Sequence, residues 1–214
     1  MSELLFEIGT EEIPAGYIQP ALDALASDAA KKLRALDLSF DAIRTFGTPR
    51  RLTLAIGELQ SRQADRRQEH MGPSKKAGFD AEGKLTKAAV GFARSRGCEP
   101  EQLQVVATAK GEYLMVAEDV KGQETAALLP ALLESLIREL VFPKSMRWAD
   151  YSMAFARPIQ WLVALYNGAA LPLDIEGVAC GAVSRGHRFL APESFEVAGV
   201  ADYLSGHQIG RAHV

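Results

Sequence analysis

Residues 4–9 carry the sequence LLFEIG, and this short apolar run decides how the first part of the chain folds. It ends at Gly9, as is typical of a buried strand that stops at a turn. From Ile18 to Leu36, apolar residues then recur every three or four positions, which predicts an amphipathic helix with one apolar face. Pro20 fits such a helix only in its first turn, because a later proline removes a backbone hydrogen bond.

Helix-type and strand-type patterns are mixed along the rest of the chain. The pair Asn167-Gly168 predicts a tight hairpin in which 162–166 pair with 171–175. Hydrophobic periodicity predicts further strands at 43–46, 52–56, 105–106, 113–117 and near Val183, and helices at 88–96 and 124–140. This order predicts an α+β fold, a mixed sheet with packed helices, and argues against a doubly wound parallel sheet.

Composition suggests where that fold is interrupted. We expect one α+β domain over residues 1–200, with a mobile basic arm at about 61–87, where charged residues and glycine replace most large apolar ones. Such an arm can follow a phosphate backbone, but acidic residues dilute its charge, which favours a plain solvated loop. Residues 201–214 are expected to begin a further element that is cut in mid-course.

The bulk charge and the cysteines limit the possible functions. Twenty-four basic and 27 acidic residues give a formal net charge of −3, so any RNA-binding surface must concentrate its cations on one face. Cys98 and Cys180 lack metal-ligand spacing, which favours reduced thiols in a cytosolic protein. Neither a membrane span of roughly 20 apolar residues nor a signal peptide is expected.

Signatures of ATP chemistry and hydrolysis are missing from the sequence: it has no Walker-type phosphate loop, no GxGxxG, no GxSxG and no HExxH. Glu7 lies within the apolar run at 4–9, and Glu11 and Glu12 follow it. Paired carboxylates can act as acid and base or hold a hard metal. Adjacent strand residues point to opposite faces, however, so we favour a structural place for Glu11 and Glu12 near the positive end of the following helix.

Three short basic strings, at 48–52, 143–148 and 185–189, contain the strongest candidates for binding phosphate or RNA. Each one alone is typical of a solvated surface, but arginine forks suit phosphate and aromatic rings suit stacking on bases. Together the strings leave a phosphate-binding or RNA-binding role and a plain surface role both open. The candidate contacts are Arg50, Arg51, Lys144, Arg147, Trp148, Arg185, His187 and Arg188.

Several strings resemble one protein family, in the same order along the chain. They are FEIGTEEIP at 6–14, TPRRL at 48–52, FDAEGK at 79–84, KGE at 110–112, PKSMRW at 143–148, FARP at 155–158 and RGHRF at 185–189. These closely resemble the N-terminal part of bacterial glycyl-tRNA synthetase beta subunits. Members of that family are much longer, so their helical HD-type and anticodon-binding regions are missing here.

The resemblance implies a subunit of an alpha2-beta2 enzyme that joins glycine to tRNA(Gly) with ATP and magnesium in the cytoplasm. It places the catalytic site, ATP and Mg²⁺ in the alpha subunit, and implies no catalytic residue, cofactor or metal in this region. The expected partners are the alpha subunit and tRNA(Gly). The region is expected to be similar to the editing-type domain of the phenylalanyl-tRNA synthetase beta chain, although glycine, the smallest substrate, needs little editing. The alternatives are a pure scaffold for the alpha subunit and a vestigial aminoacyl-tRNA deacylase.

Overall fold

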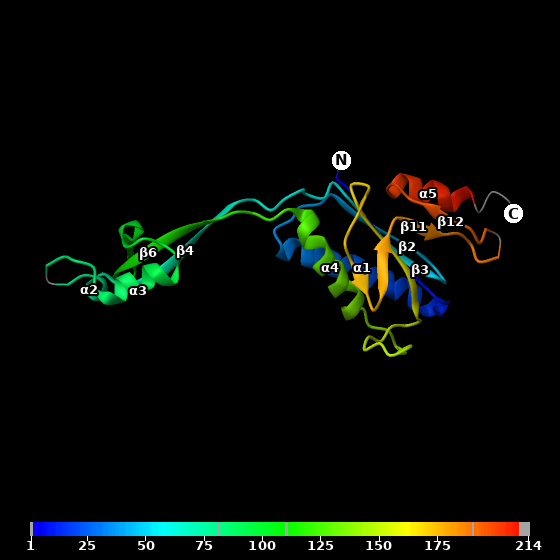
Figure 1. Ribbon diagram of the computed structural model, residues 1–214, viewed down its shortest axis with the longest axis horizontal. Coiled ribbons are helices and arrows are strands. Elements are labelled where there is room, and N and C mark those ends of the chain that lie inside the picture. The colour runs from blue at the N-terminus through cyan, green and yellow to red at the C-terminus, as the bar shows by residue number, and fades with distance from the viewer. Residues whose placement is uncertain (1, 81, 110, 190, 210–214) are drawn as a thin grey trace. The chain divides into compact units, whose positions relative to one another are not determined.

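The computed structural model describes residues 2–80, 82–109, 111–189 and 191–209. The chain forms two compact units, and Figure 1 shows the elements of each. Unit 1 comprises Met1–Gln63 and Gln123–Val214, and unit 2 comprises Ala64–Gly122. The observed class is α+β, as the sequence predicts.

A mixed seven-stranded sheet forms the centre of unit 1, with strand order β2-β3-β1-β7-β10-β9 and β8 paired to β7. Strand β1 runs antiparallel to both β3 and β7, whereas β10 runs parallel to β7. The sheet strands are β1 (Leu4–Thr10), β2 (Ala42–Thr48), β3 (Arg51–Gly57), β7 (Ile159–Tyr166), β8 (Ala169–Ala170), β9 (Asp174–Ile175) and β10 (Val178–Gly181). A separate hairpin pairs β11 (Val183–Arg185) with β12 (Ser194–Glu196).

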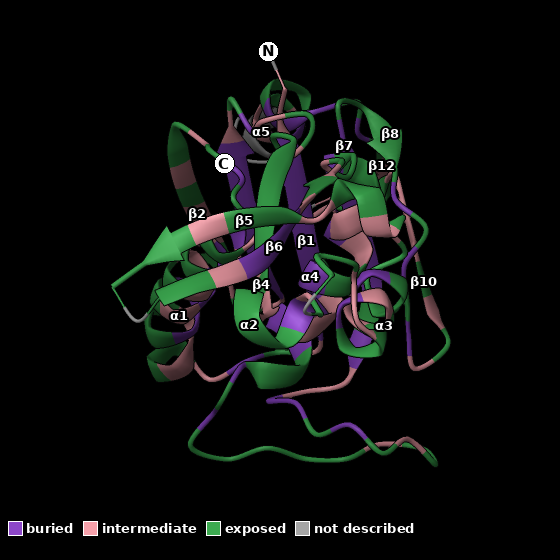
Figure 2. Cartoon of the chain, turned by 90° about the vertical axis from the view of Figure 1, so that its left-hand side faces the viewer, coloured by how far each residue is buried: buried purple, intermediate pink, exposed green. Residues whose placement is uncertain are grey.

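Both faces of β1 are covered, which explains its continuous apolar sequence. Leu4, Phe6 and Ile8 belong to a large core that includes helices α1 (Ala15–Ala35) and α4 (Thr125–Glu139). Leu5 belongs to a smaller core on the other face, which includes residues of helix α5 (Val200–Ile209). Every residue of β1 is buried, and Figure 2 shows this strand in purple.

Two sequence predictions in unit 1 need correction. Helix α1 begins at Ala15, so Pro20 lies beyond its first turn; the proline is exposed, and water can reach the backbone group that it leaves unpaired. Asn167-Gly168 does form the predicted hairpin turn, with φ of 52° and 78°. The second arm of that hairpin is only β8, and Ile175 pairs with Val178 instead of continuing along β7.

Regular elements of unit 2 occupy much of the stretch 61–87, where the sequence predicts an arm. That stretch contains strand β4 (Arg66–Ser74) and the short helix α2 (Lys75–Gly78), and it leads into helix α3 (Lys87–Ser95). Strand β6 (Gly111–Val120) pairs with β4 on one side and with β5 (Gln104–Thr108) on the other, after the 3-10 turn η1 (Pro100–Gln102). The sequence missed β4 because most of its residues are exposed or polar, so its apolar alternation is weak.

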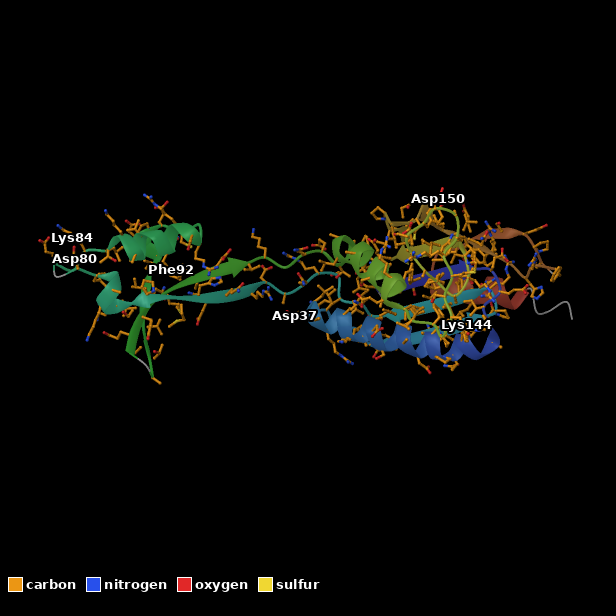
Figure 3. The ribbon with its side chains drawn as sticks, turned by 90° about the horizontal axis from the view of Figure 1, so that it is seen from below. Asp37, Asp80, Lys84, Phe92, Lys144 and Asp150 are labelled. Carbon is orange, nitrogen blue, oxygen red and sulfur yellow. The ribbon has the colours of Figure 1, made fainter. Side chains whose placement is uncertain are left out.

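The core of unit 2 is small. Helix α3 buries Ala89 and Ala93, and β6 buries Leu114, Met115 and Val116, whereas β5 is largely exposed and green in Figure 2. The string at 79–84, of which residue 81 lies outside the described residues, forms a turn. The Asp80 carboxylate accepts hydrogen bonds from the backbone N–H of Glu82 and Lys84 at 2.9 and 2.8 Å; Figure 3 labels Asp80 and Lys84 there.

Candidate nucleic-acid interface at the Trp161 end of the sheet

Three neighbouring strands place an indole ring and an arginine beside one glycine. In the sheet, Gly9 of β1 lies between Arg51 of β3 and Trp161 of β7. A β-carbon on Gly9 would lie 1.9 Å from the Trp161 ring. Glycine is therefore required at this position so that the large ring can lie across β1. The ring itself is only 6% exposed.

A buried carboxylate fixes that ring. Glu7 is fully buried and accepts hydrogen bonds from the Trp161 indole N–H, the Tyr203 hydroxyl and the Ser184 hydroxyl, the last at 2.8 and 3.1 Å. The Arg51 guanidinium lies 3.6 Å from the same carboxylate. A buried charge is tolerated only with such partners. Glu7 therefore ties strand β7, strand β11 and helix α5 to the middle of β1.

Tyr203 connects this network to β3. Its hydroxyl donates to Glu7 and accepts a hydrogen bond from Thr53 at 2.7 Å. Burial, and then the negative charge of Glu7, raise the pKa of Tyr203 above its ordinary value. The phenol stays protonated at neutral pH, and it acts as a donor that holds α5 on the sheet.

Arg51 faces the interior, although the sequence offers it as a surface contact. It is 7% exposed, and one guanidinium nitrogen donates to the carbonyl of Arg185 at 2.7 Å and to that of Gly186 at 3.4 Å. With its ion pair to Glu7, this side chain joins β3 to the segment after β11. Because Arg51 is buried, we assign it a role in positioning its neighbours. Binding of a ligand at the surface is left to the more exposed side chains around it.

Arg50 and Arg185 complete a cationic group around the indole. Their guanidinium carbons lie 5.7 and 5.0 Å from the centre of the Trp161 ring, and that of Arg51 lies at 5.9 Å. Such distances are typical of cation–π contacts. Arg50 Nε is buried and has no hydrogen-bond partner in the described part of the chain. We call Glu7, Arg50, Arg51, Trp161 and Arg185 the Trp161 cluster.

The loop after β11 continues this surface. The Arg188 guanidinium lies 3.4 Å from the Glu12 carboxylate and 3.9 Å from that of Glu11. Both acids therefore pair with Arg188, and the first turn of α1 itself carries no acidic residue. Beyond Arg188, the side chain of Phe189 is 78% exposed. The sequence strings at 6–14, 48–52 and 185–189 are thus brought together in space.

The third basic string lies elsewhere in unit 1, on the loop after α4. Lys144 and Arg147 are exposed, and neither has an ion-pair partner among the described side chains; Figure 3 labels Lys144. Trp148 packs against the large core, with Tyr151 edge-on at 6.1 Å. Its indole is therefore partly used for packing.

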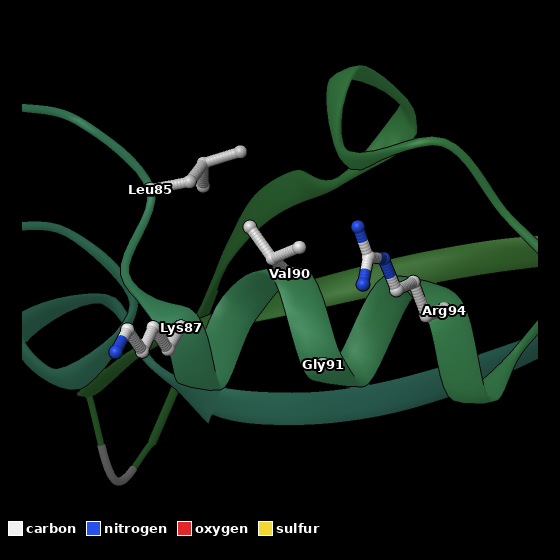
Figure 4. A pocket seen from close by; sticks show the side chains of 5 residues that line it. All are labelled: Leu85, Lys87, Val90, Gly91 and Arg94. Carbon is white, nitrogen blue, oxygen red and sulfur yellow. The ribbon is translucent and has the colours of Figure 1, made fainter.

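Unit 2 has its own shallow surface depressions. One, of about 270 Å³, lies along α3 and is lined by Leu85, Lys87, Val90, Gly91 and Arg94 (Figure 4). A second, of about 370 Å³, lies at 65–67 and 119–121. Among the residues that the structure describes, no group of three or more acidic, histidine or cysteine side chains is arranged to hold a metal ion. Within the same residues, no helix is both long and apolar enough to cross a bilayer.

Sequence reasoning identified the cations but missed the groups that organise them. Trp161 and Tyr203 lie in ordinary apolar stretches, so nothing in the local pattern distinguishes them. Glu7 does give a signal, because a carboxylate inside an otherwise apolar strand requires a buried partner.

Comparison with known proteins agrees with the ordered strings. A family model described as glycyl-tRNA synthetase beta subunit matches residues 4–211. Proteins named glycine–tRNA ligase beta subunit are 51% identical over 202 residues in Trichlorobacter lovleyi and 45% identical over 204 residues in Syntrophus aciditrophicus. These alignments cover 94% and 95% of this chain. Fold and strings therefore define an α+β region of an aminoacyl-tRNA synthetase subunit.

The chain belongs to the glycyl-tRNA synthetase beta-subunit family. It spans 29% and 30% of the length of those two relatives.

Proposed function

We propose that this region is a tRNA-contacting and assembly part of a glycyl-tRNA synthetase, and that aminoacylation takes place elsewhere in the enzyme. The observation that carries this proposal is the convergence of Arg50 and Arg185 on Trp161. Guanidinium groups that share an aromatic support keep a fixed geometry, and planar forks of this kind suit phosphate oxygens.

The composition is compatible with a local RNA surface on a weakly acidic chain. The net charge is −3, but the buried acid in the Trp161 cluster neutralises Arg51 and leaves Arg50 and Arg185 as the cations of that cluster that can meet a phosphate. Family membership supports tRNA(Gly) as the nucleic acid and a glycyl-tRNA synthetase alpha subunit as the protein partner. On this proposal, ATP and Mg²⁺ bind at the alpha subunit, and the enzyme works in the cytoplasm.

The test is the salt dependence of tRNA binding in the complete two-subunit enzyme. Changing Arg50→Gln and Arg185→Gln together removes two phosphate-binding cations, so binding should weaken and its logarithmic salt slope should fall by about 0.7–0.9 for each of the two cations. Changing Lys144→Gln and Arg147→Gln removes the same charge from the other exposed candidate string, and an unchanged salt slope in that variant would confine the tRNA contacts to the Trp161 cluster. An unchanged slope in the Arg50/Arg185 variant would remove this surface from the tRNA interface.

A purely structural scaffold makes a different prediction. In that case the Arg50/Arg185 variant should lose association with the alpha subunit, measured by sedimentation, while tRNA affinity per assembled enzyme stays constant. The likeness to an editing-type domain and a remnant deacylase activity remain predictions. Hydrolysis of alanyl- or seryl-tRNA by the complete enzyme would test the activity, and turnover equal to buffer would exclude it.

A further inference from the structure

We propose that the loop 185–189 binds an unpaired nucleobase, which stacks on Phe189 beside His187, while Arg50 and Arg185 hold the adjoining phosphates. This inference rests on the proposed RNA-contacting function and specifies which form of RNA the surface recognises. It adds to that function a stacking site formed by aromatic side chains that the Trp161 cluster does not include.

Phe189 is placed as a stacking platform. Its side chain is 78% exposed, although a ring of this size is normally buried. The Arg188 guanidinium lies over the ring at 5.5 Å from its centre, and the His187 ring lies at 6.3 Å with an interplanar angle of 54°. The exposed part of the ring remains available to a flat partner. A base that stacks there gains both aromatic and cation–π attraction.

The loop that carries Phe189 is held at both ends. Arg188 is anchored to Glu11 and Glu12 of the turn after β1. At the base of the loop, Arg51 donates to the carbonyl of Arg185 at 2.7 Å, and the Gly186 N–H donates to the carbonyl of Glu193 at 2.9 Å. A fixed platform loses little conformational entropy when a ligand binds.

Gly186 is needed for this loop conformation. A β-carbon at that position would lie 2.0 Å from the carbonyl oxygen of Ala191. The close approach brings the two sides of the loop together, and the Ala191 N–H then donates to the carbonyl of His187 at 3.0 Å. Backbone contacts across the loop therefore help to hold Phe189 in place.

An unpaired strand fits this surface better than a duplex does. Single-stranded RNA offers a free base and a charged phosphate in every nucleotide, which suits an exposed ring in the same loop as Arg185. In a duplex the bases are paired and stacked on one another, so their faces are not available to an aromatic ring. Arg188 is neutralised by Glu11 and Glu12, so Arg50 and Arg185 remain as the phosphate partners.

The experiment compares two probes on the complete two-subunit enzyme: a short single-stranded oligoribonucleotide and a blunt-ended RNA duplex of the same strand length, which has no unpaired nucleotide. Phe189→Ala should weaken binding of the single strand about ten-fold and leave the duplex unchanged. Phe189→Trp should restore binding, because it restores the aromatic face. Val141→Ala is the matched control, since Val141 is 86% exposed but aliphatic and belongs to the loop after α4.

The outcomes separate this inference from the proposed function. If the Arg50/Arg185 variant weakens both probes while Phe189→Ala weakens neither, the stacking site is refuted and the phosphate surface stands. If no variant weakens either probe, both proposals fail. If Phe189→Ala leaves RNA binding intact but dissociates the subunits in sedimentation, Phe189 is a protein contact and the stacking proposal is overturned.

Discussion

The Trp161 cluster and the loop at 143–148 differ in what the fold does with similar basic strings. TPRRL places Arg51 against the buried Glu7 and places Arg50 over an indole. PKSMRW leaves Lys144 and Arg147 exposed, and turns its own indole toward the core. A cation that pairs with a buried acid stabilises the fold, whereas an exposed cation can be replaced with little effect on stability. The two regions should therefore respond very differently to substitution.

Removing the buried carboxylate should have the largest effect. Glu7→Ala leaves Arg51 buried beside three hydrogen-bond donors that then lack an acceptor, so the free energy of unfolding should fall by about 3–5 kcal/mol. Urea denaturation followed by circular dichroism measures this change. Glu7→Gln should restore part of the stability by keeping the side-chain volume. A decrease below about 1 kcal/mol for Glu7→Ala would mean that the network does not hold the sheet face.

The next largest effect should come from filling the space under Trp161. Gly9→Ala places a methyl group 1.9 Å from the ring, and this overpacking should cost about 1–3 kcal/mol in the free energy of unfolding. Gly57→Ala is the matched control at the end of β3, where a β-carbon meets nothing within 4 Å. An equal decrease in the free energy of unfolding for Gly9→Ala and Gly57→Ala would contradict tight packing of Trp161 over Gly9.

Alkaline pH should loosen the buried network. The folded pKa of Tyr203 is raised, first by burial and then by Glu7, whereas the unfolded phenol titrates near its ordinary value of about 10. Above that pH the unfolded chain releases a proton that the folded chain keeps, so the free energy of unfolding falls as pH rises. Tyr203→Phe should make this fall shallower in urea titrations at increasing pH.

Cys180 changes the alkaline stability in the same direction, because burial and then Asp174 raise its pKa to about 12. It is present in both the parent and Tyr203→Phe, so the difference between them isolates Tyr203. Identical pH profiles for the two proteins would show that the phenol titrates alike in the folded and unfolded chains.

The smallest effect should come from the exposed string. Lys144→Ala and Arg147→Ala should each change the free energy of unfolding by no more than about 0.5 kcal/mol, because exposed charges without ion-pair partners contribute little. The same urea titration applies. A decrease comparable to that of Glu7→Ala would contradict the distinction between the two regions.

The sequence predicted most elements of unit 1 and also helix α3 and strands β5 and β6 of unit 2, but it missed strand β4 and helix α2. Strand β1 and helices α1 and α4 have strong apolar patterns of the correct period, so local sequence was sufficient for them. Strand β4 is polar and is stabilised by pairing with β6, which is distant in sequence. The local sequence therefore does not reveal this pairing. The pattern at 61–87 predicts an arm, although residues 66–74 form a strand.

The candidate site was predictable only in part. Arginine forks indicated phosphate chemistry, so the sequence alone offered Arg50, which follows a proline, and Arg185, which precedes a glycine, as candidate contacts. The sequence did not indicate that both of these arginines lie over the Trp161 ring. Trp161 is more than 100 residues from Arg50 in the chain, and strand pairing sets it beside Gly9.

The amino-acid sequence by itself determined the family, the α+β class and the set of available cations, since ordered strings and periodicity are local properties. Only the tertiary structure decided which cations are buried and which face outward. Whether a cation is buried or exposed depends on contacts between β1, β3, β7, β11 and α5. The buried Glu7 carboxylate fixes its neighbours there, because an unpaired charge in the interior is too costly to keep.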